Sequence, residues 1–337
     1  MKLKKILPII LCLLLTACSG SAPEEYSYDF FAMDTYMSLT AYGDNAEKGV
    51  KAAAGRIAEL TLMLSVTDEN SELSAINRGG VAKVSEETAG LIAFALDIAD
   101  KTDGALDPTV YPVLRAWGFT ADQNRVPAPE EISALLKNIG HEHVQVDGNT
   151  VALDKGMMLD LGAVAKGYAG DETERILREN GITSALINLG GNIQLVGSKP
   201  DGTDWRLGLK DPAGAGNIGV LTVSDCAVVT SGSYERCFTA EDGTVYGHII
   251  DPASGYPADN GLISVTIIAD EGRLCDALST ALFVMGEECA LEYWRENKNF
   301  DVILITDNAE VLITGGAADK FQLDSAYGNL TVKVVEE

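Results

Sequence analysis

The order of the expected strands and helices constrains the fold more than any other feature of this sequence. Apolar residues recur at helical spacing in the segments 46–64, 86–101, 129–138, 163–180, 276–285 and 287–297. Segments typical of strands lie at 28–41, 184–188, 193–196, 205–209, 218–223, 227–230, 245–250, 262–268, 302–306, 311–314 and 331–335, with a hairpin at 143–153. Strands therefore come in runs separated by single helices. This order predicts an α+β fold with largely antiparallel or mixed sheets and argues against a doubly wound dinucleotide fold.

The charge balance excludes one large class of partner. The chain has 25 lysine and arginine residues against 50 aspartate and glutamate residues, which gives a net charge of −25. Binding to nucleic acid requires a basic face, so nucleic acid is not an expected partner. Anionic lipid headgroups would repel the same surface, so any attachment to a membrane must come from something other than charge.

The N-terminus predicts export. Three lysines in the first five residues precede a short apolar run at 6–15, which is typical of a secretory signal. Small residues then precede Cys18, as in a bacterial lipobox, so we expect Cys18 to be lipid-modified and to become the mature N-terminus. An ordinary signal peptide with an incidental cysteine is the alternative.

The chain is accordingly divided into a lipoprotein signal peptide at 1–17, a lipid-anchored tether at 18–27 and one folded domain at 28–337. We expect the protein to lie outside the cytoplasm, anchored to the cell membrane. The folded part contains four cysteines, Cys226, Cys237, Cys275 and Cys289, and no CxxC pair, which argues against a zinc site. Free, buried thiols are favoured over disulfides because a core of this size needs no covalent staples.

Two segments have residues suited to anions and cations. Residues 159–171 leave a turn and enter a helix, so the free N–H groups of the first helical turn, with Lys166 beside them, predict an anion site. Asp276 and Thr280 lie at i and i+4 of a helix, where a carboxylate and a hydroxyl converge on one hard cation such as magnesium. The alternatives are a glycine-rich helix start that only packs, and an Asp276 that only interacts with the dipole at its helix start.

His248 is the candidate general base. It lies between an expected strand and a Pro/Gly turn, whereas His141 and His143 flank a glutamate in a loop and are expected to be solvated. A hydrogen-bonded structural histidine is the alternative. Segments 106–112, 188–192 and 230–236 are typical turns by composition, and the chain has no Gly-x-Ser-x-Gly motif of a serine hydrolase.

Taken in order, these motifs resemble the ApbE family of FAD:protein FMN transferases. The motifs are 33–35 (MDT), 71–74 (SELS) with Asn77, 106–109 (LDPT) with 117–119 (WGF), 160–167 (DLGAVAKG), 188–192 (NLGGN), 230–232 (TSG) with 234–236 (YER), 248–252 (HIIDP) and 276–280 (DALST). The resemblance covers essentially the whole mature chain. It implies a T-fold-like α+β core, and an exported, often lipid-anchored enzyme.

The resemblance also implies a reaction and a set of site residues. Such an enzyme splits the pyrophosphate of FAD, transfers FMN to a threonine or serine hydroxyl of a partner protein and releases AMP. Magnesium would be held by Asp276, Thr280 and the carbonyl of Ala163, and His248 would accept the proton of the acceptor hydroxyl. The FAD site would be lined by Met33, Ala105, Leu106, Asp107, Asp160, Lys166 and Ile250. The implied acceptor is a subunit of a membrane-bound redox complex.

Two positions depart from the family pattern. Members commonly carry an aromatic residue against the flavin just before the 71–74 motif, where this chain has Thr67 and Asn70. Members often carry a second acidic residue just before the metal-binding threonine, where this chain has Ser279. The site could therefore hold one metal ion or two. Two alternatives therefore stay in view: a magnesium-dependent FAD pyrophosphatase that yields FMN and AMP, and a non-enzymatic FAD-binding lipoprotein.

Overall fold

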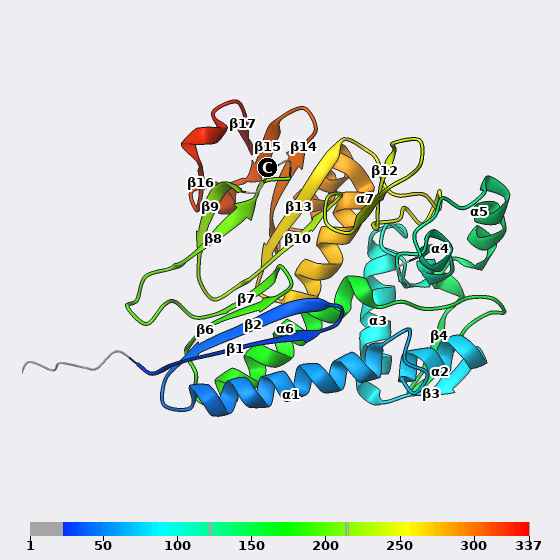
Figure 1. The fold of residues 1–337 in the computed structure, drawn as a ribbon, viewed down its shortest axis with the longest axis horizontal. Coiled ribbons are helices and arrows are strands. Elements are labelled where there is room, and N and C mark those ends of the chain that lie inside the picture. Colours follow the sequence, from blue (N-terminus) through cyan, green and yellow to red (C-terminus); the bar gives the residue numbers. More distant parts are fainter. Residues whose placement is uncertain (1–22, 121–122, 213, 215, 337) are drawn as a thin grey trace, which may run out of the picture.

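A nine-stranded sheet forms the centre of the computed structural model, which describes residues 23–120, 123–212, 214 and 216–336 (Figure 1). Its strands, in spatial order, are β1 (Glu25–Ala32), β2 (Thr35–Tyr42), β6 (Ser184–Leu189), β7 (Asn192–Val196), β10 (Ala227–Gly232), β13 (Leu262–Ala269), β14 (Asp301–Thr306), β15 (Glu310–Thr314) and β17 (Thr331–Val335). Neighbouring strands are antiparallel except β15 and β17, which are parallel. The α+β prediction is confirmed.

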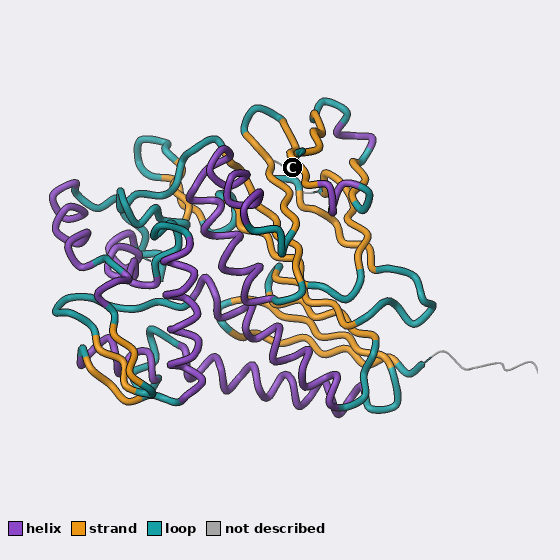
Figure 2. Tube along the Cα trace, turned by 180° about the vertical axis from the view of Figure 1, so that it is seen from behind, coloured by secondary structure: helices purple, strands orange, loops and turns teal. Residues whose placement is uncertain are grey.

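Three long helices cover one face of this sheet: α1 (Ala46–Leu64), α6 (Gly162–Glu179) and α7 (Gly272–Glu296) (Figure 2). In α1 the buried residues Val50, Ala53, Ile57 and Leu60 recur every three or four positions, so one stripe of the helix packs on β1 and β2. Because α6 and α7 pack on each other as well as on the sheet, residues far apart in the sequence meet between them. The site described below lies at this contact.

The opposite face of the sheet is covered by a small sheet of β16 (Phe321–Leu323), β9 (Asn217–Val223) and β8 (Trp205–Lys210), in that order. Side chains from both sheets form an apolar core, including Val228 and Ile268 from the large sheet and Leu209 and Leu221 from the small one. Even-numbered residues of β10 therefore face the small sheet, and odd-numbered residues face α7, as the two-residue period of a strand requires.

A helical lobe adjoins one end of the large sheet. It contains α2 (Glu72–Gly79), α3 (Glu86–Lys101), α4 (Tyr111–Trp117) and α5 (Pro129–Leu135), and the short strands β3 (Val81–Lys83), β4 (Gln145–Asp147) and β5 (Thr150–Ala152). The hairpin of β11 (Cys237–Thr239) and β12 (Val245–Gly247) packs Phe238 and Tyr246 against the buried Trp117. The short helix α8 (Gly315–Ala318) follows β15.

Several expected boundaries are corrected by long-range pairing. The segment 28–41 is two strands, β1 and β2, joined by a tight turn in which Met33 and Asp34 have φ angles of 46° and 57°. Strand β1 begins at Glu25, inside the segment assigned to the tether, because it pairs with Tyr42. The strand expected at 245–250 ends at Gly247.

Helix α7 begins at Gly272, four residues earlier than expected. Gly286 is non-helical at φ 77°, so two helical segments meet at a kink there, which agrees with the separate helices expected at 276–285 and 287–297. Asp276 therefore lies within the helix and does not interact with an N-terminal dipole. The helix starts early because the carboxylate of Asp171 in α6 accepts hydrogen bonds from the N–H groups of Gly272 (2.5 Å) and Arg273 (3.0 Å).

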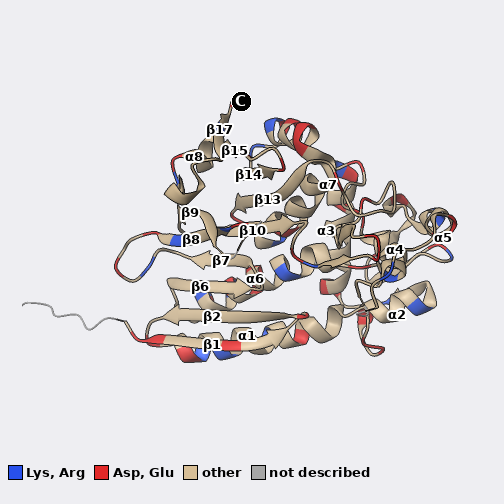
Figure 3. Ribbon diagram, turned by 45° about the horizontal axis from the view of Figure 1, so that its top comes forward, with Lys and Arg blue, Asp and Glu red and all other residues tan. Residues whose placement is uncertain are grey.

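The four cysteines of the domain are all free, but only Cys275 is fully buried, while Cys237 and Cys289 are exposed. The expectation of buried thiols was thus wrong for two of them. Acidic and basic residues are interspersed along α1 (Figure 3). No helix of the described residues is both long enough and apolar enough to span a membrane. The signal segment 1–17 and Cys18 lie outside the described residues.

Candidate active site

Two glycines let the backbones of α6 and α7 touch. A Cβ atom added at Gly167 would lie 2.2 Å from the carbonyl oxygen of Gly272 and 2.7 Å from the Cα of Arg273. A Cβ at Gly272 would lie 2.7 Å from the carbonyl oxygen of Gly167. Any side chain at either position would force the helices apart, so the glycines set the distance across which the site is built.

This close approach brings a buried carboxylate onto α6. Asp276 in α7 is only 3% exposed, and its Oδ2 accepts a hydrogen bond from the backbone N–H of Gly167 at 2.9 Å. Its Oδ1 lies 3.5 Å from the Nζ of Lys166, which balances the buried negative charge. In a regular helix the N–H of Gly167 faces the carbonyl of Ala163, so Asp276 lies beside that carbonyl.

The oxygen atoms around Asp276 fit a hard cation. The set comprises the Asp276 carboxylate, the Thr280 hydroxyl one turn later and the Ala163 carbonyl, which are the oxygen types that magnesium prefers. No group of three or more histidine, cysteine, aspartate or glutamate side chains suited to a metal occurs in the described part of the chain. A cation here would depend on one carboxylate and would keep positions open for water or phosphate.

Ser279 already has partners within the protein. Its fully buried Oγ donates to the carbonyl of Asp276 at 2.9 Å and lies 2.8 Å from the Oγ of Ser231 in β10. Ser231 is also 3.4 Å from the Oγ1 of Thr280. Ser231 was not among the residues predicted for the site, although its segment was singled out as a turn, and it connects β10 to the predicted cation ligands.

The start of α6 differs from the expected anion site. The N–H of Gly162 donates to Asp160 Oδ1 at 2.8 Å, and the N–H groups of Val164 and Ala165 donate to the carbonyl of Leu161. The predicted row of free N–H groups is therefore absent at these three positions. Burial raises the pKa of Asp160, and the positive charges of Lys166 and Arg236 oppose that shift.

Asp107 caps the turn that precedes α4. Its Oδ1 accepts from the N–H (2.8 Å) and the hydroxyl (2.6 Å) of Thr109, and its Oδ2 accepts from the N–H of His141 at 3.0 Å. The ring of His141 is 3.3 Å from the same carboxylate, so the prediction of a solvated His141 was wrong. With these contacts, the Asp107 side chain holds its own loop together.

Of the remaining residues predicted for FAD, those of two segments are connected to this region, and Ile250 lies in a separate apolar cluster. The next residue in the loop, Pro108, accepts a hydrogen bond from the N–H of Asp160 at 2.8 Å, which joins the segment of Ala105 and Leu106 to the start of α6. Ile250 is buried against Trp117 and Ile132. Met33 lies in the β1–β2 turn, and the neighbouring Asp34 carbonyl accepts a 3.3 Å hydrogen bond from Arg236.

His248 lies in the loop after β12, beside the ring of Phe119. Its Nδ1 is buried and has no hydrogen-bond partner among the described residues. Desolvation, together with the positive charges of Arg236 and Lys166, lowers the pKa of His248 to about 4. The imidazole is therefore neutral at physiological pH and able to accept a proton.

Two more residues of the site were not predicted. Arg236 is close enough to affect the pKa values of both Asp160 and His248, and it also holds the β1–β2 turn. The Nδ2 of Asn192 is buried and finds no hydrogen-bond partner in the part of the chain that the structure describes, and Asn192 lines a small cavity together with Lys166 and Gly167. Both residues belong to motifs whose composition alone indicated only turns.

Thr67 and Asn70 are exposed in the loop between α1 and α2. The hydroxyl of Thr67 is 3.2 Å from that of Ser65, and the amide of Asn70 donates to Asp68 at 3.2 Å. These positions thus carry short polar side chains with local partners.

Comparison with known proteins identifies the family. The model of the ApbE family matches residues 33–304. The chain belongs to the ApbE family. The FAD:protein FMN transferase of Treponema pallidum is 33% identical over 348 residues, which cover 95% of this chain and 96% of that protein. A protein of the same name from Klebsiella pneumoniae is 34% identical, covering 90% and 96%.

ApbE structures have the same architecture. The ApbE protein of Thermotoga maritima superposes with a TM-score of 0.80 at 34% identity, covering 92% of this chain and all of that one. The flavin transferase ApbE of Vibrio cholerae gives a TM-score of 0.77 at 28% identity, covering 91% and 99%. The family expected from the motifs is therefore confirmed.

Proposed function

We propose that this ApbE protein transfers the FMN part of FAD to a threonine or serine hydroxyl of an acceptor protein and releases AMP. The observation that carries the proposal is the buried Asp276 carboxylate, which lies between the Gly167 N–H and Lys166, one helical turn from Thr280. Breaking a phosphoanhydride requires charge neutralisation at its oxygens. A cation held by Asp276 and Thr280, with Lys166 beside it, would supply that positive charge.

Magnesium is part of the proposal. Asp276, Thr280 and the carbonyl of Ala163 would hold one ion, which supplies positive charge to the pyrophosphate when it is bound. The arrangement of Ser279 favours a single ion, because its hydroxyl is occupied by Asp276 and Ser231. Lys166 lies next to Asp276 and adds a second positive charge on the same side of the site.

His248 would act as the general base. The acceptor hydroxyl oxygen forms a bond to the phosphorus of the FMN half, the bond from that phosphorus to the bridging oxygen breaks, and AMP leaves with that oxygen. The hydroxyl proton passes to the neutral imidazole of His248. Binding of a negatively charged pyrophosphate nearby would raise the pKa of His248 and strengthen it as a base.

FAD would be positioned by several loops. Met33, Ala105, Leu106, Asp107, Asp160, Lys166 and Ile250 are the residues we assign to it. Asp107, whose carboxylate is occupied by Thr109 and His141, would contribute through its backbone. Asp160, whose pKa is raised, would be a partner for a hydrogen-bonding group of FAD and not for a phosphate.

Hydrolysis of FAD by water is the second candidate. It is favoured by the loop of Thr67 and Asn70, which offers short polar side chains where an aromatic residue would hold the flavin. The same cation and base would serve, with water in place of the acceptor hydroxyl.

We further propose that residues 1–17 are removed, that Cys18 is lipid-modified, and that the enzyme acts outside the cytoplasm on a subunit of a membrane-bound redox complex. The polar segment that follows Cys18 would serve as the tether up to β1.

One experiment separates these functions. The purified protein is incubated with FAD and magnesium, with and without an envelope extract, and AMP and protein-bound flavin fluorescence are measured. Transfer predicts AMP release that depends on the extract, together with a fluorescent protein band. AMP release at the same rate without extract would identify the pyrophosphatase, and FAD binding without any AMP would identify a simple binding protein.

A further inference from the structure

Strand β10 has an open edge beside the candidate active site. It pairs with β13 along its whole length, from Ala227 to Gly232. On its other side it pairs with β7 only through Ala227 and Val228, because β7 begins at Asn192 and the chain then turns away. In the described residues, no strand covers this side of β10 from Val229 onward.

The hydrogen-bonding groups of Thr230 point to that open edge. Leu195 N–H donates to the carbonyl of Cys226 on the β7 side, and Ser233 N–H donates to the carbonyl of Ile263 on the β13 side. Since the direction alternates along an antiparallel strand, the N–H and C=O of Thr230 face the β7 side. The residue opposite is Gly191, whose N–H instead donates to Asn188 Oδ1 at 2.9 Å.

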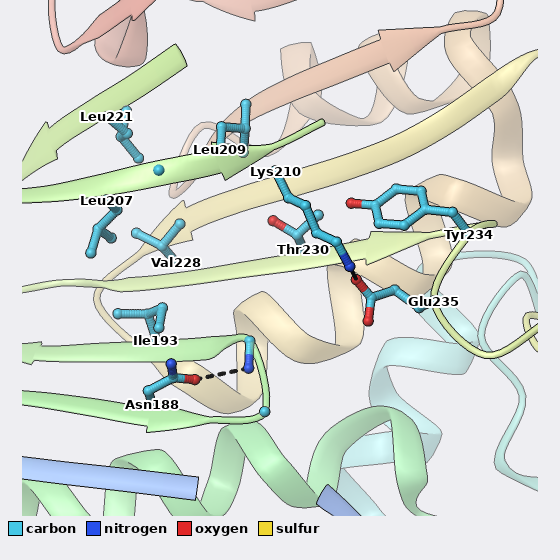
Figure 4. Close-up of a pocket in the computed structure, with 13 residues that line it drawn as sticks. Asn188, Ile193, Leu207, Leu209, Lys210, Leu221, Val228, Thr230, Tyr234 and Glu235 are labelled. Carbon is cyan, nitrogen blue, oxygen red and sulfur yellow. Dashed lines mark hydrogen bonds and ion pairs between the residues drawn. The ribbon is translucent and has the colours of Figure 1, made fainter. Parts of the chain in front are cut away.

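A cavity of about 230 Å³ opens at this point, between the β6–β7 turn, β8, β9 and β10 (Figure 4). Ile193, Leu207, Leu209, Leu221 and Val228 give it an apolar end. Lys210, Glu235 and Tyr234 lie at the other end, with Thr230 between the two ends. None of the side chains assigned to FAD or to the cation lines this cavity.

Successive side chains of β10 face the cavity and the candidate active site in turn. Thr230 and Val228 face the cavity, whereas Ser231 faces α7, where its Oγ lies 3.4 Å from Thr280 Oγ1. Residues that pair across neighbouring strands point to the same face of the sheet. An extended segment placed along the open edge would therefore direct one side chain toward Thr280 and the adjacent one into the cavity.

We propose that this edge and cavity bind the acceptor polypeptide, which pairs with the open edge of β10 as an added strand. Its hydroxyl residue then points to α7, and a neighbouring apolar side chain enters the cavity among Leu207, Leu209 and Val228. The proposal rests on the transfer function proposed above and specifies how the acceptor is recognised. Backbone pairing supplies binding without sequence preference, and the cavity supplies the preference for an apolar neighbour. An acceptor polypeptide is the occupant that this position favours, because Ser231, the next residue of β10 after Thr230, lies 3.4 Å from Thr280.

The test uses synthetic peptides of eleven residues with one central threonine and with leucine, phenylalanine, alanine or aspartate on either side of it. Flavin transfer to each peptide is measured with the wild-type protein, with Leu207→Glu and with Leu62→Glu. The last variant makes the same change at an exposed leucine of α1 and serves as the control. The affinity for FAD is measured in parallel for all three proteins.

We expect kcat/KM for the wild type to be at least tenfold higher with leucine or phenylalanine than with aspartate beside the threonine. Leu207→Glu should lose that preference while its Kd for FAD stays within twofold, and Leu62→Glu should behave as the wild type. A second variant, Leu207→Ala, should shift the preference from leucine toward the larger phenylalanine, a result that partial unfolding does not produce.

Any one of the following results would overturn the proposal. The first is equal transfer to all peptides, or an unchanged preference in Leu207→Glu. The second is a loss of FAD affinity in Leu207→Glu that matches its loss of transfer, because the cavity would then belong to the FAD site. The third is a wild-type protein that labels a protein of the envelope extract but none of the peptides. If neither the extract nor the peptides are labelled, the proposed function itself has failed.

Discussion

The contact between α6 and α7 at Gly167 offers the sharpest test of how this fold builds its site. Replacing Gly167 with alanine adds one methyl group in a helix, which by itself favours folding by about 1 kcal/mol. At this position, however, the new Cβ would lie 2.2 Å from the Gly272 carbonyl oxygen and 2.7 Å from the Arg273 Cα. Both atoms are backbone, so the helices must separate by about an ångström or more.

Overpacking of this kind costs about 1–3 kcal/mol or more, which exceeds the gain in helix propensity. Because the clash is with backbone atoms, we expect the upper end of that range, so Gly167→Ala should lower the free energy of unfolding by about 2 kcal/mol after the gain in helix propensity is subtracted. The displacement also moves Asp276 away from Ala163, and a misplacement of about 1 Å at a reacting centre costs on the order of 10²-fold in rate. AMP release should fall accordingly.

Gly90→Ala provides the matched control. Gly90 is an exposed residue of α3, and a Cβ built there meets nothing within 4 Å. The free energy of unfolding of this variant should rise by up to about 1 kcal/mol, and its activity should be unchanged. Urea unfolding followed by tryptophan fluorescence measures the first quantity, and the FAD assay measures the second. A Gly167→Ala protein as stable and as active as Gly90→Ala would refute the idea that this helix contact sets the geometry of the site.

The other predictions concern single side chains. Asp276→Asn should reduce magnesium-dependent AMP release by about 10²-fold or more without lowering the urea midpoint, and residual activity that EDTA does not affect would remove the metal assignment. His248→Gln should slow transfer by about 10²- to 10⁴-fold with little change in FAD affinity. The pKa of His248 is lowered to about 4, so between about pH 6.5 and pH 4 the unfolded chain binds a proton that the folded chain does not bind. The free energy of unfolding of the wild type should therefore fall as the pH drops through that range. His248→Gln should lack this part of the fall. Asp171→Ala removes the cap of α7 and should lower the free energy of unfolding by about 1–2 kcal/mol. An unchanged free energy of unfolding in urea would show that the cap is dispensable.

Local sequence determined the elements that depend on neighbouring residues. The helices expected at 46–64 and 86–101 have those bounds in the structure, since their apolar spacing and, in the second, the Ser85 cap lie within the helix or next to it. The family motifs likewise identified Asp276, Thr280, Lys166 and His248 as candidates, because they are runs of adjacent residues.

Only the tertiary structure decided how those residues meet. Helix α7 starts at Gly272 because Asp171, about a hundred positions earlier, caps it. The carboxylate of Asp276 reaches Lys166 and Gly167 because two glycines on different helices allow their backbones to touch. The pKa of His248 and the open edge of β10 depend in the same way on segments that are remote in sequence. Periodicity describes one element at a time, whereas burial, charge balance and unpaired edges arise only when elements pack together.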